Sequence, residues 1–145
     1  PAMSAPATRS RTTAPVPRPW TASVVAATVG VEALALLLSA LALFTTLFTG
    51  HVLPVAGIVF GTVVLAGGAV WLAAAARGAW AGLRWPRAAV LVSQAFLLIV
   101  GLSFLQMALG GWGLVVAAVA VVTILCLLAP STVAWMHRTR DDAAR

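Results

Sequence analysis

Glu32 is the one ionisable residue that lies well inside a long apolar run, between Trp20 and Thr49. A carboxyl group in hydrocarbon is costly, so an acidic residue in such a run is by default a candidate functional group. Small and polar residues recur at spacings of three, four or seven and share one face of the predicted helix. They are Thr21, Thr28, Glu32, Ala35, Ser39, Ala42 and Thr46. We expect this face to turn toward other helices and not toward lipid.

Three interpretations of Glu32 are open from the sequence. The first is a structural hydrogen bond to Gln94 or an ion pair with Arg77 or Arg87. The second is a carboxylate that binds a proton or another cation. The third is a side chain that extends toward water at the membrane surface. Because the run is longer than the roughly 20 residues that cross a bilayer, Glu32 lies either at mid-membrane or about two turns from the cytoplasmic surface.

A polar site around Glu32 needs partners from another helix, and the third apolar run contains them. This run carries Ser93, Gln94, Ser103 and Gln106. Buried side-chain amides hydrogen-bond across membrane helices, and each bond contributes about 0.6–2 kcal/mol. We interpret these residues as contacts between helices, and the alternative is that they line a polar path. The candidate intramembrane site comprises Glu32, Gln94, Thr28 and Ser39.

The other reactive residues form no recognisable catalytic or metal-binding pattern. Cys126 is the only cysteine, so the chain cannot form an internal disulfide. His51 and His137 fall on opposite sides of the membrane in the predicted topology and cannot share a site in a monomer. The sequence contains no zinc-protease, paired-cysteine, nucleophile-elbow or phosphate-loop motif. We therefore expect no enzyme activity, no metal and no cofactor.

Composition indicates a membrane protein. Of the 145 residues, 62% are hydrophobic and only 8% are charged, whereas ordinary soluble domains contain about 25% charged residues. The net charge of +6 comes from nine basic residues, all of them arginine, against three acidic residues. A positive-inside distribution explains these charges without a nucleic-acid partner. The sequence predicts an all-α integral membrane protein whose partner is the lipid bilayer.

The apolar runs and the turn residues between them predict a bundle of four transmembrane helices. The spans cover residues 21–49, 53–76, 88–109 and 114–135. Short turns at Gly50–Pro54 and Gly110–Gly113 join the spans in pairs, which predicts two antiparallel hairpins. Pro130 should kink or end the last helix, because proline lacks the N–H that a helix needs.

Three segments follow one another along the chain. Residues 1–19 are basic and rich in proline and alanine, and they predict a disordered tail. Residues 20–136 form the predicted transmembrane domain. Residues 137–145 form a short charged tail.

The positions of arginine and tryptophan predict which side of the membrane each loop faces. The arginines fall into three groups, and the two short turns contain none. With four spans, all three groups lie on one side, so we expect both termini in the cytoplasm and the protein in the cytoplasmic membrane. Residues of the middle group either serve only to hold this loop on the cytoplasmic side or also bind lipid headgroups. They are Arg77, Trp80, Arg84, Trp85 and Arg87.

Small residues are expected to bring helices into close contact. Gly57 and Gly61 form a small-xxx-small pattern in the second span, with Gly68 further along it. Gly101 lies on the same stripe of the third span as Gln94. These glycines fit packing within the chain as well as they fit a homodimer.

Several short motifs stand in a characteristic order along the chain. A Glu-Ala pair in the first span is followed by Ala-Arg-Gly, by an Arg-Trp-x-Arg group and by a glutamine early in the third span. The residues are Glu32, Arg77, Gly78, Arg84, Trp85, Arg87 and Gln94, with Pro130 and Ser131 near the end of the fourth span. In this order, residues 20–135 resemble a group of small actinobacterial four-span membrane proteins, described as hypothetical or tryptophan-operon-associated. The resemblance implies four spans and no known activity.

Two functions are consistent with these residues. The first is an accessory or structural membrane protein that acts through helix–helix contact, as a homo-oligomer or as a subunit of a larger membrane complex. The short turns and the stripes of small residues favour it. The alternative is a minimal proton-coupled transporter of small molecules that uses Glu32. The single carboxyl group on a polar helix face favours this alternative.

Overall fold

The structure is a computed structural model that describes residues 17–50, 52–107 and 110–143. Side chains are described as far as residue 137, with Gly110 excepted. The predicted disordered tail falls mainly on residues 1–16 and therefore lies outside the described part of the chain. The placement of His51 lies outside it as well.

The described part of the chain folds into five helices and contains no strand. The helices are α1 (Trp20–Thr49), α2 (Val55–Trp80), α3 (Pro86–Leu105), α4 (Gly110–Leu128) and α5 (Pro130–Ala143). Helices α1 to α4 have the length and the apolar composition needed to cross a membrane. The all-helical prediction is therefore confirmed, and the four apolar helices indicate a multi-pass membrane protein.

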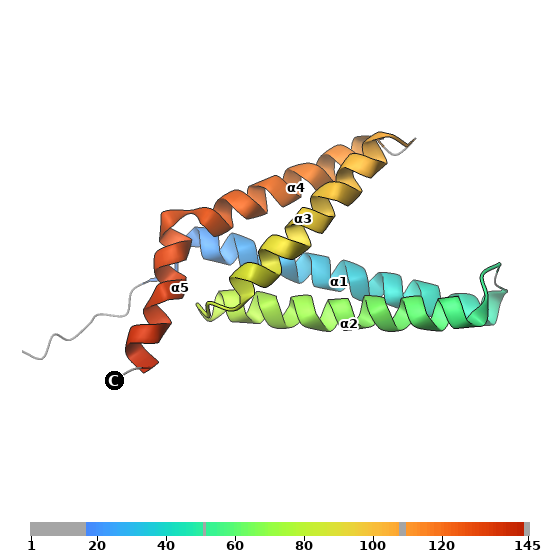
Figure 1. Cartoon of the computed structure of the whole chain (residues 1–145), viewed down its shortest axis with the longest axis horizontal. Coiled ribbons are helices and arrows are strands. Elements are labelled where there is room, and N and C mark those ends of the chain that lie inside the picture. Colours follow the sequence, from blue (N-terminus) through green and yellow to red (C-terminus); the bar gives the residue numbers. More distant parts are fainter. Residues whose placement is uncertain (1–16, 51, 108–109, 144–145) are drawn as a thin grey trace, which may run out of the picture.

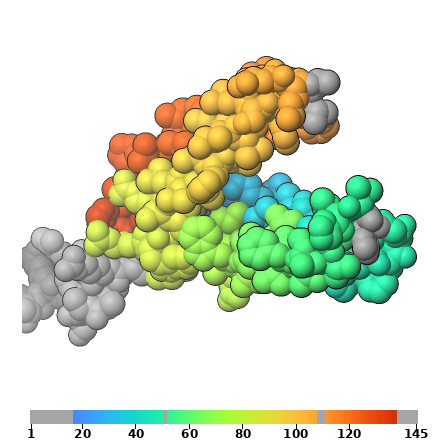
Figure 2. All heavy atoms as spheres, turned by 45° about the vertical axis from the view of Figure 1, so that its right-hand side comes forward, coloured from blue at the N-terminus to red at the C-terminus, as the bar shows by residue number. Residues whose placement is uncertain are grey.

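The helices form two arms that meet at one end (Figure 1). In the first arm α1 lies beside α2, and in the second arm α3 packs against α4. Contacts between the arms are fewer, and the arms come together at the end where α5 and the α2–α3 loop lie. Away from this end the arms diverge. Figure 2 shows the space between them, called the notch below, with part of α1 visible at its base.

The buried core lies where the two arms meet. Most of its side chains are alanine or valine, which allow helix backbones to approach closely. Larger side chains from α4 and α5, Leu127 and Met136, close this end of the core. The other members are Val25, Ala26, Val29, Ala33, Leu72, Ala75, Ala76, Ala79, Ala89 and Val90. This core fixes the first half of α1 against the second arm.

A short loop between Trp80 and Pro86 joins the arms, and a glycine cap shapes its start. The Leu83 N–H donates to the Gly78 oxygen at 2.9 Å, and the Gly82 N–H donates to the Ala79 oxygen at 3.2 Å. This pair of bonds is a Schellman motif, which satisfies the last carbonyl groups of a helix. Gly82 has a φ of 77°, a conformation that favours glycine.

Helix α5 packs against the same loop. A Cβ atom on Gly82 would lie 3.0 Å from Nε1 of Trp135, so any other residue here would press against Trp135 as well as strain the turn. Arg18 contributes to this end of the molecule, because its guanidinium group lies 3.7 Å from the ring centroid of Trp80 and 5.9 Å from that of Trp135. The loop, the start of α1 and α5 are thus held together.

The prediction of one fourth span over residues 114–135 is wrong at both ends. Helix α4 covers Gly110–Leu128, and a separate helix starts at Pro130. The prediction that Pro130 ends the regular helix is confirmed, and the missing N–H and the steric clash of the proline ring explain it. Helix α5 continues to Ala143, so most of the predicted charged tail is helical.

Two predicted connections also differ from the structure. Gly110–Gly113 were expected to form a turn, but they are the first residues of α4. The third helix ends at Leu105 and not at Leu109, so the connection lies earlier, around Gln106. The middle loop is shorter than predicted, because Arg77 belongs to α2 and Arg87 to α3.

Candidate intramembrane site

Glu32 and Gln94 form a polar contact between the two arms. Nε2 of Gln94 donates to both carboxylate oxygens of Glu32, each at 2.8 Å. Glu32 lies about 18 Å along α1 from Trp20, and Gln94 lies about 12 Å along α3 from Pro86, at the usual helical rise. The hydrogen bond between Glu32 and Gln94, which belongs to the first of the three interpretations, is present in the structure.

Gln94 is fully buried, but its amide is only half paired. The side chain is 0% exposed, and Oε1 has no hydrogen-bond partner among the described residues. An ionised carboxylate only accepts hydrogen bonds, so the amide must present its N–H group to it. The arrangement in the structure, with Nε2 facing both oxygens, matches the ionised carboxylate. Protonation of Glu32 would add an O–H donor, which needs an acceptor in place of this N–H.

Among the described side chains, no arginine forms an ion pair with Glu32, whose side-chain partner is Gln94. Arg77 lies in the last turn of α2 and Arg87 in the first turn of α3, toward the loop. The alternative of an ion pair with either of them is not what the structure contains. An ionised Glu32 therefore has an amide donor but no cation from this part of the chain, which is an unfavourable state in lipid.

Hydroxyl groups extend the polar face of α1 toward α4 and α5. Oγ1 of Thr123 lies 3.2 Å from Oγ1 of Thr28. Nearer the loop, Oγ1 of Thr132 donates to Oγ1 of Thr21 at 2.6 Å, and Oγ of Ser131 lies 3.0 Å from the same Thr21 oxygen. The inward orientation predicted for Thr28 is thus correct, but its partners were not predicted. Their only sequence signal is that they are hydroxyl residues in or beside an apolar run.

Ser39 does not join this site. Its side chain is exposed, and Oγ donates to the backbone oxygen of Ala35 in the same helix at 2.8 Å. In the same way, Oγ of Ser103 donates to the oxygen of Ile99 at 2.9 Å, and Gln106 is exposed beyond the end of α3. The polar face of α1 is therefore paired only where the arms meet, because farther along the arms diverge.

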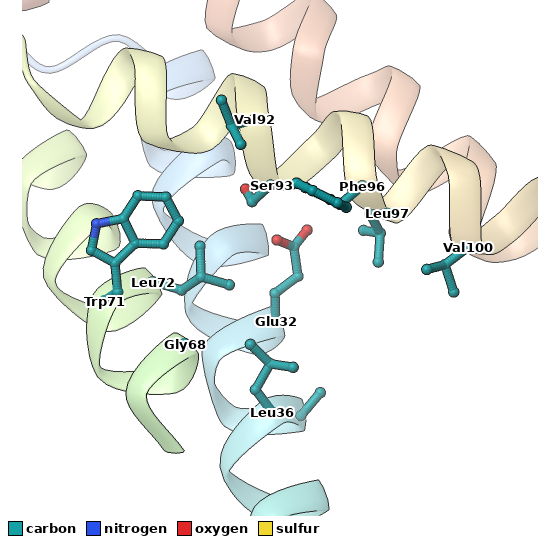
Figure 3. A pocket seen from close by; sticks show the side chains of 11 residues that line it. Glu32, Leu36, Gly68, Trp71, Leu72, Val92, Ser93, Phe96, Leu97 and Val100 are labelled. Atoms are coloured by element: carbon teal, nitrogen blue, oxygen red, sulfur yellow. The ribbon is translucent and has the colours of Figure 1, made fainter. Parts of the chain in front are cut away.

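A cavity of about 380 Å³ opens beside Glu32 at the base of the notch. Figure 3 shows the carboxyl group reaching from α1 toward α3, with Trp71 and Leu72 of α2 on one side and Phe96 of α3 on the other. Of the described residues that line the cavity, only Glu32 is ionisable. Ser93 is the other residue with an oxygen in its side chain, and its hydroxyl donates to the backbone oxygen of Val90 at 2.9 Å.

Two glycines bring α3 and α4 into backbone contact. A Cβ atom on Gly101 would lie 2.9 Å from the backbone nitrogen of Ala117. One on Gly113 would lie 2.6 Å from the backbone oxygen of Gly101. Real Cβ atoms do not tolerate such distances, so both positions require glycine. Gly101 was predicted as a packing residue, whereas Gly113 was predicted only as part of a turn.

The glycines predicted in the second span differ in their roles. Gly61 and Gly68 face α1, since Cβ atoms there would lie 2.9 Å from Cδ2 of Leu43 and 3.4 Å from Cδ1 of Leu36. Gly57 is exposed and would have nothing within 4 Å of its Cβ atom. The small-xxx-small pattern therefore marks one contact of α2 with α1 and one open position.

The residues predicted at lipid headgroups gather at the end where the arms meet. Arg77 and Trp80 lie in the last turn of α2, and Arg84 and Trp85 lie in the loop. All four side chains are exposed, and Arg87 at the start of α3 is half-buried. Within the described residues, no group of three or more His, Cys, Asp or Glu side chains could hold a metal ion.

Comparison with known proteins gives no assignment. No model of a protein family matches the chain. No curated protein and no solved structure matches it either. Inferences about function therefore depend on the residues of this chain alone.

Proposed function

We propose that the protein belongs to the cytoplasmic membrane and crosses it as two antiparallel hairpins, α1–α2 and α3–α4, with both termini in the cytoplasm. Arg18, Arg77, Arg84 and Arg87 all lie toward the end where the arms meet. The connections at the far ends of the arms, residues 50–54 and 106–109, contain no arginine. The positive-inside rule assigns the arginine-rich end to the cytoplasm.

Single cysteines test this topology. In a Cys126→Ala background, Leu53→Cys places a thiol in the α1–α2 connection, and Leu83→Cys places one in the α2–α3 loop. A membrane-impermeant maleimide added to intact cells should label position 53 and should label position 83 only after permeabilisation. The reverse pattern, or equal labelling of both positions, would contradict the proposed orientation.

The function that this geometry supports best is assembly with other transmembrane helices, as an accessory or structural membrane protein. The observation that carries it is the notch. Each arm is packed within itself, but beyond the Glu32–Gln94 contact the arms leave their facing surfaces uncovered. Phe96 and Val92, which line the base of the notch, are 66% and 50% exposed. A helix from a second copy or from another subunit would bury this surface by close packing.

Crosslinking in native membranes tests the assembly. In the Cys126→Ala background, Val100→Cys places a thiol on the wall of the notch. The matched control is Leu125→Cys, an exposed position on α4 outside the cavity lining. We expect position 100 to give a discrete crosslinked species, either a dimer or a complex with another protein, and position 125 to give less. A protein that stays monomeric at both positions would contradict the assembly function.

A second candidate function is proton-coupled transport of small molecules. The cavity favours it, because Glu32 is the one ionisable residue among the described residues that line it and has no cationic partner among them. In proteoliposomes, an imposed pH gradient should drive uptake of the transported small molecule by the wild type and by the exposed control Ser39→Ala. It should be lost with Glu32→Gln. Unchanged uptake by Glu32→Gln would reject transport through this residue.

A further inference from the structure

We propose that the end where the arms meet carries a binding site for the headgroup of an anionic phospholipid. Arg18, held on the ring of Trp80, binds the phosphate, and Arg77 supplies a second positive charge. The inference goes beyond assembly with other helices and does not depend on it. It rests on the proposed placement of this end at a membrane surface, which the cysteine labelling tests separately.

The position of the Arg18 side chain is the first argument. Its Cζ atom lies 3.7 Å from the ring centroid of Trp80 and 5.9 Å from that of Trp135. A guanidinium group on the face of an indole ring is attracted by the ring and presents its N–H groups around its edge. Among the described residues, none accepts a hydrogen bond from Arg18 or forms an ion pair with it. The ring therefore limits the movement of the group, and its donors stay free for an external ligand.

The second argument is a second charge beside the same ring. Arg77 precedes Trp80 by three residues in the last turn of α2, so the two side chains are neighbours on the helix surface. Together they line a hollow of about 440 Å³. The acidic side chain that the structure describes is Glu32, about 18 Å along α1 from Trp20. No described acidic group therefore neutralises this end, which favours a ligand with net negative charge.

The walls of the hollow are the third argument. Its other lining residues are the alanines Ala26, Ala76 and Ala81. Ala76 lies about 6 Å before Trp80 along α2, and Ala26 lies about 9 Å beyond Trp20 along α1, so both lie farther into the apolar spans. A phospholipid has the matching arrangement, with its charge at the level of the tryptophans and its apolar part over the alanines. A free phosphate ion would leave the apolar walls uncovered.

The chemistry of the two groups favours an anionic headgroup over a zwitterionic one. A guanidinium group binds two phosphate oxygens through parallel N–H bonds, which the ammonium group of lysine does not do. Phosphatidylglycerol offers this phosphate with a net negative charge. Phosphatidylcholine offers the same phosphate but adds a quaternary ammonium group, which the second arginine would repel.

Native mass spectrometry of the full chain in dodecylmaltoside tests the site. The chain is titrated with dioleoyl phosphatidylglycerol or dioleoyl phosphatidylcholine, which differ only in the headgroup. We expect saturable binding of one phosphatidylglycerol molecule per chain and weaker binding of phosphatidylcholine. Arg18→Gln should weaken phosphatidylglycerol binding by about 10-fold or more, the effect of losing a hydrogen bond to a charged group.

The matched control is Arg84→Gln, which removes the same charge from the loop at the same end. Arg84 is exposed and rests on no described ring, so this variant should bind phosphatidylglycerol nearly as well as the wild type. Equal weakening by Arg18→Gln and Arg84→Gln would overturn the proposal, because it would show attraction by overall charge and not a site.

Two further variants separate the geometry of the site from its charge. Arg18→Lys keeps the charge but loses the planar donor group, and Trp80→Leu removes the ring but keeps every charge, so both should weaken binding. Circular dichroism confirms that each variant keeps its helices. Full binding by Arg18→Lys, or displacement of the lipid by millimolar inorganic phosphate, would overturn a lipid-headgroup site. The same spectra report the oligomeric state, so failure of the assembly function is distinguished from failure of the lipid site.

Discussion

At the scale of single residues, one amide determines the environment of Glu32. Gln94 is the fully buried member of the pair, and Glu32 is half-buried. Loss of Glu32 would leave both ends of the buried amide without a partner, and loss of Gln94 would leave the carboxyl group without its donor. An unpaired buried polar group costs more than the pair itself contributes.

Glu32→Leu and Gln94→Leu should therefore be less destabilising together than the sum of their separate effects. We expect a coupling free energy of about 0.6–1.7 kcal/mol, the range for hydrogen bonds between membrane helices. The measurement is a double-mutant cycle on the free energy of unfolding in mixed SDS and dodecylmaltoside micelles. Ser103→Ala, on the same helix but bonded only to its own backbone, serves as the control. Additive effects of the two leucine variants would show that the contact does not contribute.

The polar residues of the site could be predicted only in part. The spacing of Thr28 and Glu32 placed them on one inward face, and the similar position of Gln94 in its helix made it a candidate partner. The end of that face was not predictable, because Ser39 has the correct helical spacing but lies where the second arm has diverged. Spacing along one helix carries no information on where a neighbouring helix departs from it.

At the scale of the elements, glycine has opposite roles at similar-looking positions. Gly101 and Gly113 let the backbones of α3 and α4 touch, whereas Gly57 stands in open space. Sequence patterns alone rank Gly57 with the packing residues because of its spacing from Gly61. The run of glycines at 110–113 likewise predicts a turn, because nothing in its sequence shows that another helix lies against Gly113.

Gly101→Ala and Gly113→Ala should each destabilise the protein by about 1–3 kcal/mol, the usual cost of overpacking. In each case the added methyl group would meet backbone atoms, which cannot move aside as a side chain can. Gly57→Ala is the matched control and should be neutral or stabilising by up to about 1 kcal/mol, since alanine favours helix more than glycine does. Unfolding in mixed micelles distinguishes the three variants. Equal stability of all three would show that α3 and α4 do not pack as closely as described.

The apolar helices themselves were largely predictable, because 62% hydrophobic residues leave few positions where a membrane helix can end. The first span agrees with α1 within one residue, and the break at Pro130 follows from proline chemistry. Helix α5 was not predicted as a separate helix, because its first residues were included in the fourth span and its charged second half was predicted as a tail. Its attachment depends on contacts at Thr132, Met136 and Trp135 with segments that are distant along the chain.

At the scale of the whole molecule, the small contact between the arms should limit the cooperativity of unfolding. Each arm has extensive internal contacts, and the arms share the core near the loop, the Glu32–Gln94 bond and the hydroxyl contacts of α1. Elements that share few contacts unfold separately more readily than elements that share many.

Pulling the protein from its C-terminus out of a bilayer should therefore give two unfolding steps. The second arm should leave first, and the first arm should follow at a separate force. Single-molecule force spectroscopy measures the number of steps and the length of chain released in each. Thr123→Val should lower the force of the first step, because it removes a hydroxyl contact between the arms. A single step that releases all four apolar helices at once would contradict this view of the molecule.

The short loop with its glycine cap also has a mechanical consequence. It joins the two helical arms at one end, so a change of conformation in the loop rotates one arm relative to the other. A rod as long as α3 measures about 30 Å, and a rotation of about 10° at its base moves its tip by about 5 Å. Small changes where Gly82 approaches Trp135 would thereby be magnified at the far ends of the arms. The packing around Gly82 therefore determines the separation of the arms at their far ends more than any contact along the arms does.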